Sequence, residues 1–203
     1  MIQFRDLAFE KSATRLADCP RDPNPEVAVS GRSNVGKSSL LNALAGRRGL
    51  AKVSARPGKT RSLNFFRLSP TARLVDLPGY GFARVSPAEQ QRWRRFMEEY
   101  LEARAQLAGL VQLVDCRHAP TAQDRQMVDW LRHRELPFIV VLTKIDKIGR
   151  GARARAVAGA REALDLAGDD ALCFFSSATG EGRKELIAWI LAALRGEAPA
   201  AGT

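Results

Sequence analysis

Apolar runs that suit buried strands alternate along the chain with segments of helical periodicity. Short runs rich in Val, Leu, Ile and Phe mark the expected strands, at residues 27–30, 63–68, 74–77, 110–115, 138–143 and 172–176. This alternation is typical of an α/β domain, because parallel strands need crossovers that are usually helical. We therefore expect a largely parallel sheet with helices on both faces.

Helical segments in this pattern begin with clear start signals. Ser86, Pro87 and Glu89 supply an N-cap, a first-turn proline and a capping-box acid. Thr121 and Asp124 repeat the capping-box pattern. Apolar residues follow both signals at steps of three and four, so we expect each helix to bury one face.

The pattern also predicts one domain with an extension at each end. Residues 1–24 show weak periodicity and end in a proline-rich stretch, which indicates an N-terminal extension that packs on the domain. Residues 25–195 hold the expected strands, and residues 196–203 form a tail that we expect to be flexible. The apolar stretches fall short of the roughly 20 residues of a membrane-spanning helix, and the N-terminus lacks a secretory signal. We expect a cytoplasmic monomer.

A glycine-rich motif at residues 31–38 fits the pattern GxxxxGK[ST] between a strand and a helix, the setting of a loop that binds nucleotide phosphates. Its two glycines let the backbone curl so that N–H groups face the α- and β-phosphates, at the positive end of the next helix. Lys37 supplies a positive charge to the β- and γ-phosphates, and the Ser38 hydroxyl is expected to bind Mg²⁺. The expected contacts come from Gly31, Arg32, Ser33, Asn34, Val35, Gly36, Lys37 and Ser38.

A DxxG pattern, formed by Asp76, Leu77, Pro78 and Gly79, ends the strand at residues 74–77. Alone this pattern carries little information. When the pattern follows a phosphate loop along the chain, as it does here, it indicates a nucleotide site. Asp76 would then hold a metal-bound water, and the Gly79 N–H would bind the γ-phosphate. We expect all four residues to contact the nucleotide.

The loop at residues 46–62 is rich in Gly, Arg, Lys and Pro, and it is suited to cover the phosphates. A second hydroxyl for the metal could come from Ser54, Thr60 or Ser62. Spacing does not choose among them.

Thr143, Lys144, Ile145 and Asp146 follow the apolar residues 138–142 directly, at the carboxyl end of a strand where open α/β sheets bind ligands. The Asp146 carboxylate can accept from two ring N–H donors of guanine, whereas adenine offers no matching pair. The Lys144 stem can lie across the ring. A backbone N–H for the guanine O6 is expected from Ser176, Ser177 and Ala178.

The net charge of +10 and the pI near 10.2 are strongly basic. Such a charge gives a salt-dependent attraction to nucleic acid and other polyanions. The three cysteines are far apart and show no CxxC spacing, so neither a disulfide framework nor a zinc site is expected. Two interpretations besides a GTPase stay open: a P-loop ATPase or small-molecule kinase, against which Asp146 argues, and a basic RNA- or ribosome-binding module with little hydrolysis.

Residues 11–194 resemble the EngB family of bacterial GTPases, through the segments GRSNVGKSSLLNAL, RPGKTRSLNFF, DLPGYGFARV, TKIDK and SSATGEG. The resemblance implies a three-layer, Ras-like P-loop NTPase fold with a six-stranded, mostly parallel sheet and one antiparallel edge. It also implies a role in assembly of the large ribosomal subunit, with a pre-ribosomal or rRNA partner, and in septum formation during cell division. Thr60 would be the second Mg²⁺ ligand and a γ-phosphate sensor, within nucleotide contacts from Gly58, Lys59, Thr60, Arg61 and Ser62.

Catalysis would rest on Lys37, Thr60 and Gly79, with GTP and Mg²⁺ as substrate and cofactor and GDP as product. Ras-type enzymes place a water-orienting glutamine after DxxG, but this chain has Tyr80. We therefore predict slow unassisted hydrolysis. Asn34 resembles the asparagine of potassium-dependent relatives, which makes activation by K⁺ a hypothesis.

Overall fold

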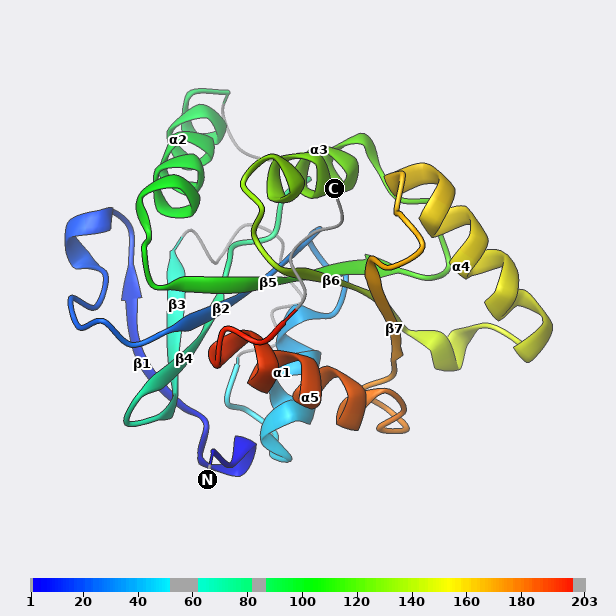
Figure 1. The fold of residues 1–203 in the computed structure, drawn as a ribbon, viewed down its shortest axis with the longest axis horizontal. Helices are drawn as coiled ribbons and strands as arrows, with labels where there is room; N and C mark the ends of the chain where they lie inside the picture. The colour runs from blue at the N-terminus through cyan, green and yellow to red at the C-terminus, as the bar shows by residue number, and fades with distance from the viewer. Residues whose placement is uncertain (1, 52–61, 82–86, 199–203) are drawn as a thin grey trace.

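The computed structural model describes residues 2–51, 62–81 and 87–198. Within these residues the chain forms a seven-stranded sheet flanked by five α-helices (Figure 1). The strands are β1 (Ala8–Ala13), β2 (Glu26–Gly31), β3 (Leu63–Ser69), β4 (Ala72–Asp76), β5 (Leu107–Asp115), β6 (Phe138–Thr143) and β7 (Ala171–Phe175). The helices are α1 (Lys37–Ala45), α2 (Pro87–Ala103), α3 (Ala122–His133), α4 (Arg150–Leu164) and α5 (Arg183–Leu194).

The strand order is β1-β3-β4-β2-β5-β6-β7. From β4 to β7 the neighbouring strands are parallel, and β3 and β1 add an antiparallel edge. The strands β2 and β6 are buried along their whole length, as expected for parallel strands covered on both faces. The α/β P-loop fold expected from the sequence is confirmed.

Helices cover the two faces of the sheet as separate layers (Figure 1). One apolar core contains Tyr100 of α2, Leu131 of α3 and Leu164 of α4. The opposite core contains Leu41 of α1 and Ile190 of α5. The capping box expected at the start of α3 is present, whereas the expected cap Ser86 before α2 lies outside the described residues.

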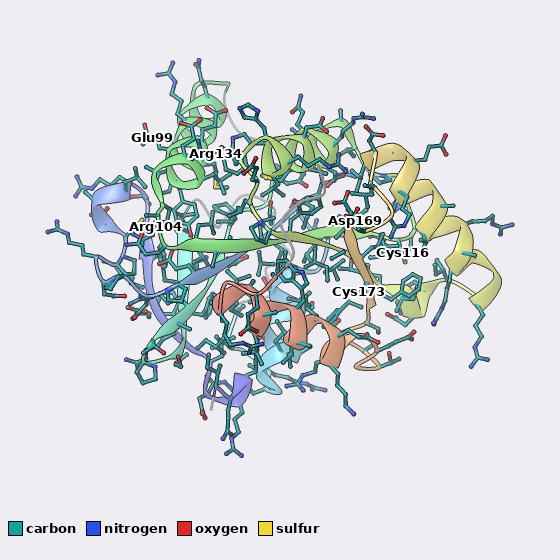
Figure 2. The ribbon with its side chains drawn as sticks, in the orientation of Figure 1. Glu99, Arg104, Cys116, Arg134, Asp169 and Cys173 are labelled. Atoms are coloured by element: carbon teal, nitrogen blue, oxygen red, sulfur yellow. The ribbon has the colours of Figure 1, made fainter. Side chains whose placement is uncertain are left out.

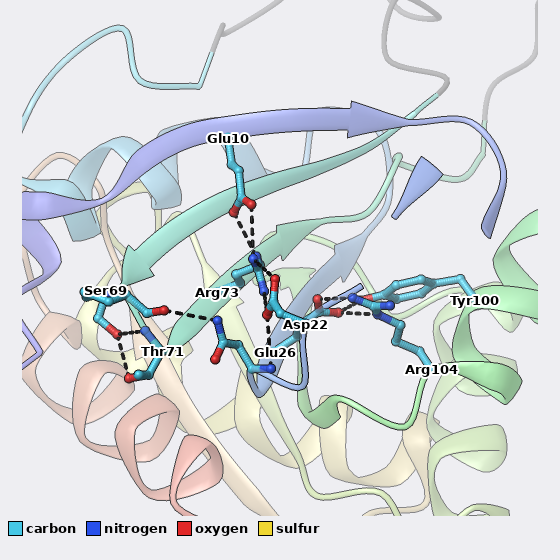
Figure 3. Close-up of polar contacts among 10 residues, drawn as sticks. Glu10, Asp22, Glu26, Ser69, Thr71, Arg73, Tyr100 and Arg104 are labelled. Carbon is cyan, nitrogen blue, oxygen red and sulfur yellow. Dashed lines mark hydrogen bonds and ion pairs between the residues drawn. The ribbon is translucent and has the colours of Figure 1, made fainter. Parts of the chain in front are cut away.

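In the part of the chain that the structure describes, the sheet has seven strands, so the expectation of six is wrong. The additional strand, β1, comes from the N-terminal extension and pairs with β3. Most of its side chains are exposed, so it lacks the apolar alternation that marks a strand in a sequence. Charged side chains, rather than an apolar face, connect this extension to the sheet. Arg73 of β4 binds Glu10 of β1 at 2.8 Å and Asp22 at 2.6 Å (Figure 3).

A second ion pair lies at the start of β2, where the Glu26 carboxylate is completely buried. Arg104, just beyond the end of α2, binds it at 2.6 Å, and the Tyr100 hydroxyl donates to it at 3.1 Å (Figure 3). A buried carboxylate needs such partners, because an uncompensated charge is costly in the interior. These contacts attach the carboxyl-terminal end of α2 to the sheet.

Cys19, Cys116 and Cys173 are all free thiols. Cys116 directly follows β5 and Cys173 lies on β7 (Figure 2). Among the described helices, none is long and apolar enough to cross a membrane.

Candidate functional site

The loops that follow β2, β4, β6 and β7 meet at one edge of the sheet. Because these strands are parallel, their carboxyl ends lie on the same side, where ligands bind in open α/β sheets. Hydrogen bonds join the loops to one another. The Thr143 hydroxyl donates to the Val35 carbonyl at 2.8 Å and to the Val114 carbonyl at 3.2 Å. The strand-end residues thus hold the phosphate loop in place.

The predicted phosphate loop turns between β2 and α1 through residues of unusual backbone geometry. Gly31 and Gly36 have φ angles of 149° and 114°, and Asn34 has a φ of 62°. A Cβ at Gly31 would lie 2.9 Å from the Leu113 carbonyl oxygen of β5, so only glycine fits there. The loop ends at the first turn of α1, whose free N–H groups and dipole favour an anion.

Lys37, at the start of α1, and the buried Asp76, at the end of β4, lie near enough for the charge of each to affect the pKa of the other. Burial lowers the pKa of Lys37, and the charge of Asp76 opposes this. Burial raises the pKa of Asp76 to about 6, against the opposing effects of Lys37 and of a hydrogen bond from Asn64. The Lys37 amine is also 3.5 Å from the Gly31 carbonyl. Two charges that are costly to bury are therefore kept where a phosphate and its cation would meet.

The residues present fit a magnesium ion. Asp76 Oδ1 is buried, and no described residue donates to it. Ser38 lies in the first turn of α1 and is half-buried. Carboxylate and hydroxyl oxygens are the ligands that Mg²⁺ prefers, alongside water and phosphate.

Of the three residues that could supply the second hydroxyl to the metal, the described part of the chain contains only Ser62. The Ser62 hydroxyl donates to Asn64 Oδ1 at 3.3 Å. Outside the described residues lie Ser54, Gly58, Lys59, Thr60 and Arg61. The choice of the second hydroxyl therefore stays a prediction.

The DxxG segment runs directly along the phosphate loop. Leu77 and Pro78 are buried, and the Leu77 N–H donates to the Val29 carbonyl at 3.0 Å. A Cβ at Gly79 would lie 2.8 Å from Lys37 Nζ and 3.0 Å from the Ser33 nitrogen. The close approach of this backbone to the loop explains why the position needs glycine.

Tyr80 has structural partners that the sequence did not reveal. Its hydroxyl donates to Asp124 Oδ1 and accepts from Gln112 Nε2, both at 2.5 Å. These residues are 44 and 32 positions away along the chain, and no sequence pattern connects them. The Tyr80 side chain thus points toward β5 and α3.

At the other end of the site, Lys144 crosses toward the phosphate loop from a left-handed backbone position with a φ of 61°. Its amine donates to the Asn34 carbonyl at 2.7 Å and to Asp115 Oδ2 at 2.8 Å. Arg117 also binds Asp115, at 2.8 Å. Asp115 was not among the predicted site residues. Its place at the end of β5, next to the predicted loops, is the signal that could have found it.

Asp146 is held by the last of the predicted loops. The Ser176 hydroxyl donates to Asp146 Oδ1 at 2.8 Å, and Lys147 lies 3.3 Å from Oδ2. The Ser176 hydrogen bond lowers the pKa of Asp146, so the carboxylate is ionised at neutral pH.

Ser176 itself is buried, and its hydroxyl accepts from the Ala178 N–H at 3.2 Å. The neighbouring Ser177 and Ala178 are exposed. Ile145, which directly precedes Asp146, is buried. An ionised, fixed carboxylate next to an exposed turn can recognise a ring that presents paired N–H donors.

The sequence matches the family described as 50S ribosome-binding GTPase over residues 26–144. It is 50% identical over 186 residues to a probable GTP-binding protein EngB of Pelotomaculum thermopropionicum, covering 92% of this chain and 94% of that protein. A probable GTP-binding protein EngB of Geobacillus thermodenitrificans is 47% identical over 180 residues, or 89% of this chain and 92% of that protein.

Solved structures of GTP-binding proteins have similar folds. The crystal structure of a probable GTP-binding protein EngB matches with a TM-score of 0.70 and 24% identity, over 84% of this chain and 98% of that one. Era of Aquifex aeolicus, bound to GDP and AlF₄⁻, matches with a TM-score of 0.65 and 25% identity, over 83% of this chain and 56% of that one. With half of the residues identical to a curated relative over nearly the whole length, the chain belongs to the EngB family of GTP-binding proteins.

Proposed function

We propose that this chain binds GTP with Mg²⁺, hydrolyses it slowly and acts as a switch. The observation that carries the proposal is that the glycine-rich loop, Lys37, Asp76 and the Asp146 carboxylate all lie at one sheet edge. Asp146 would accept from the two N–H donors on the guanine edge. Adenine would leave that carboxylate without partners, which is unfavourable. On this proposal, residues 25–195 are the GTP-binding domain.

The phosphates would be held by the N–H groups of residues 31–38 and by the Lys37 amine. Ser38 and Thr60 would hold Mg²⁺, with Asp76 acting through a bound water. The ion would neutralise charge on the β- and γ-phosphate oxygens. The Gly79 N–H would bind the γ-phosphate and so report its presence.

Slow hydrolysis follows from the placement of Tyr80. Its hydroxyl is engaged by Asp124 and Gln112, so it does not orient a water toward the γ-phosphate. Activation by K⁺ through Asn34 is part of the proposal, and equal turnover in potassium and sodium buffers would remove it.

The proposed partner is a precursor of the large ribosomal subunit in the cytoplasm. Support comes from the description of the matching family as ribosome-binding GTPases and from the net charge of +10, which favours contact with RNA phosphates. A monomer would bind the particle in one nucleotide state and leave it in the other. An effect on septum formation in cell division would then follow indirectly.

Calorimetric titration with GTP, GDP and ATP in the presence of Mg²⁺ tests the nucleotide proposal. We expect binding of both guanine nucleotides and no comparable binding of ATP. Equal affinity for ATP and GTP would contradict it. Co-sedimentation with large-subunit particles, with a non-hydrolysable GTP analogue and with GDP, tests the switch. Identical co-sedimentation in both states would count against it.

A further inference from the structure

Tyr80 connects the DxxG segment to two elements outside the phosphate loop. Its hydroxyl bonds with Asp124 and Gln112 are both 2.5 Å long. Asp124 is the capping-box residue of α3, and Gln112 lies within β5. We call these three residues the Tyr80 latch.

The carboxylate in the latch is buried and has several donors. Asp124 is 2% exposed, and its Oδ2 accepts from the Thr121 N–H at 2.7 Å and the Thr121 hydroxyl at 2.6 Å. Its Oδ1 accepts from Gln112 Nε2 at 3.3 Å as well as from Tyr80. Hydrogen bonds to a charged, buried acceptor are stronger than those between neutral groups. The tyrosine hydroxyl is therefore held firmly.

The backbone of Tyr80 contacts the phosphate loop. The Ser33 N–H donates to the Tyr80 carbonyl at 2.9 Å, and Arg32 forms a β-bridge with Tyr80. Gly79 lies so near Lys37 that a Cβ would be 2.8 Å from its amine. The Tyr80 carbonyl oxygen competes with a phosphate for the Ser33 N–H, and it carries a partial negative charge that repels one.

We propose that the Tyr80 latch holds the DxxG segment against the phosphate loop and thereby favours GDP over GTP. The inference rests on the proposed function, because it needs a guanine nucleotide in the loop. A γ-phosphate between Lys37 and the Gly79 N–H requires the backbone of residues 79–80 to move off its present contacts with Lys37 and Ser33, so that the phosphate fits between them. This movement pulls the Tyr80 hydroxyl from its partners. The α- and β-phosphates bind closer to α1 and make no such demand. The latch thus sets the relative affinities of the two nucleotide states.

The substitution Tyr80→Phe tests this, since it keeps the ring and removes only the hydroxyl. Affinities for GDP and for a non-hydrolysable GTP analogue are measured by calorimetry with Mg²⁺. We expect the ratio to shift about tenfold toward the GTP analogue, the effect of one hydrogen bond to a charged group. Tyr100→Phe is the matched control, because the Tyr100 hydroxyl likewise donates to a buried carboxylate, that of Glu26, at 3.1 Å. It should leave the ratio unchanged.

Asp124→Asn tests the latch from its other side, because the amide oxygen can still cap α3. It should shift the ratio in the same direction, and the double variant should shift it no further than the larger single effect. An unchanged ratio in folded Tyr80→Phe protein, or a shift toward GDP, would overturn the inference while the proposed function stands. If the unsubstituted protein binds neither nucleotide, the proposed function fails and the inference fails with it.

Discussion

Asp76→Asn should stabilise the protein in the absence of nucleotide and at the same time weaken Mg²⁺-dependent nucleotide binding. Burial raises the pKa of Asp76 to about 6 from 3.8. At about 1.4 kcal/mol for each pH unit, the ionised carboxylate costs the folded protein about 3 kcal/mol. Asparagine has nearly the same shape but carries no charge, so it escapes this cost.

The sign of the pH dependence follows from the raised pKa. Well below pH 3.8 the Asp76 carboxyl is protonated in both the folded and the unfolded states, so it does not reduce stability there. As pH rises toward about 6, the unfolded state ionises first and stability falls, and above about 6 the full loss is present. The stability gap between Asp76→Asn and the unsubstituted protein should therefore open across this interval and then stay constant.

Urea unfolding at pH 4, 5, 6 and 7.5, monitored by circular dichroism, measures the gap. We expect about 0.5 kcal/mol at pH 4 and about 3 kcal/mol at pH 7.5, in favour of Asp76→Asn. Asp115→Asn is the opposite control. Burial alone would raise the pKa of Asp115, but hydrogen bonds from Arg117 and Lys144 hold it well below its ordinary value. Asp115→Asn should therefore destabilise at pH 7.5. A loss of stability in Asp76→Asn at pH 7.5, or a gap independent of pH, would refute the reasoning.

Further predictions concern the base, the DxxG glycine and the buried ion pair. Asp146→Asn should lower GTP affinity about 100-fold, the effect of two hydrogen bonds to a charged group, and favour xanthosine triphosphate; calorimetry that finds GTP affinity intact would exclude guanine recognition by this carboxylate. Gly79→Ala places a Cβ 3.0 Å from the Ser33 nitrogen, which should cost about 1–3 kcal/mol of stability; an unchanged urea midpoint would contradict the close approach. Arg104→Ala leaves the buried Glu26 carboxylate without its cation, which should cost about 3–5 kcal/mol. Thermal unfolding should show most of this loss recovered when Glu26→Gln is added, and no recovery would mean that the charge is not the cause.

The sequence predicted the central sheet and the site loops because their signals are local. Each parallel strand is an apolar run that ends in a loop. In residues 31–38, the positive φ angles of the loop fall mainly on glycines that the sequence shows directly. The Thr121–Asp124 capping box likewise lies within one turn of helix. Signals of this kind need no knowledge of distant contacts.

What the sequence did not predict depends on contacts between distant segments. The strand β1 exists because its backbone pairs with β3 and because Arg73 binds Glu10, 63 residues away. The partners of Tyr80 and the contact between Asp115 and Lys144 also come from separate strands and helices. Polar residues of these types are usually solvated, so their composition alone gave no reason to pair them.

The strand β1 also protects the sheet. A strand at the edge of a sheet presents unpaired N–H and C=O groups, which invite pairing with another chain. Deletion of residues 1–13 would uncover β3 along Leu63–Ser69 and remove Glu10 from Arg73. A shortened protein would therefore tend to aggregate through edge-to-edge pairing even with the loops of its candidate nucleotide site intact.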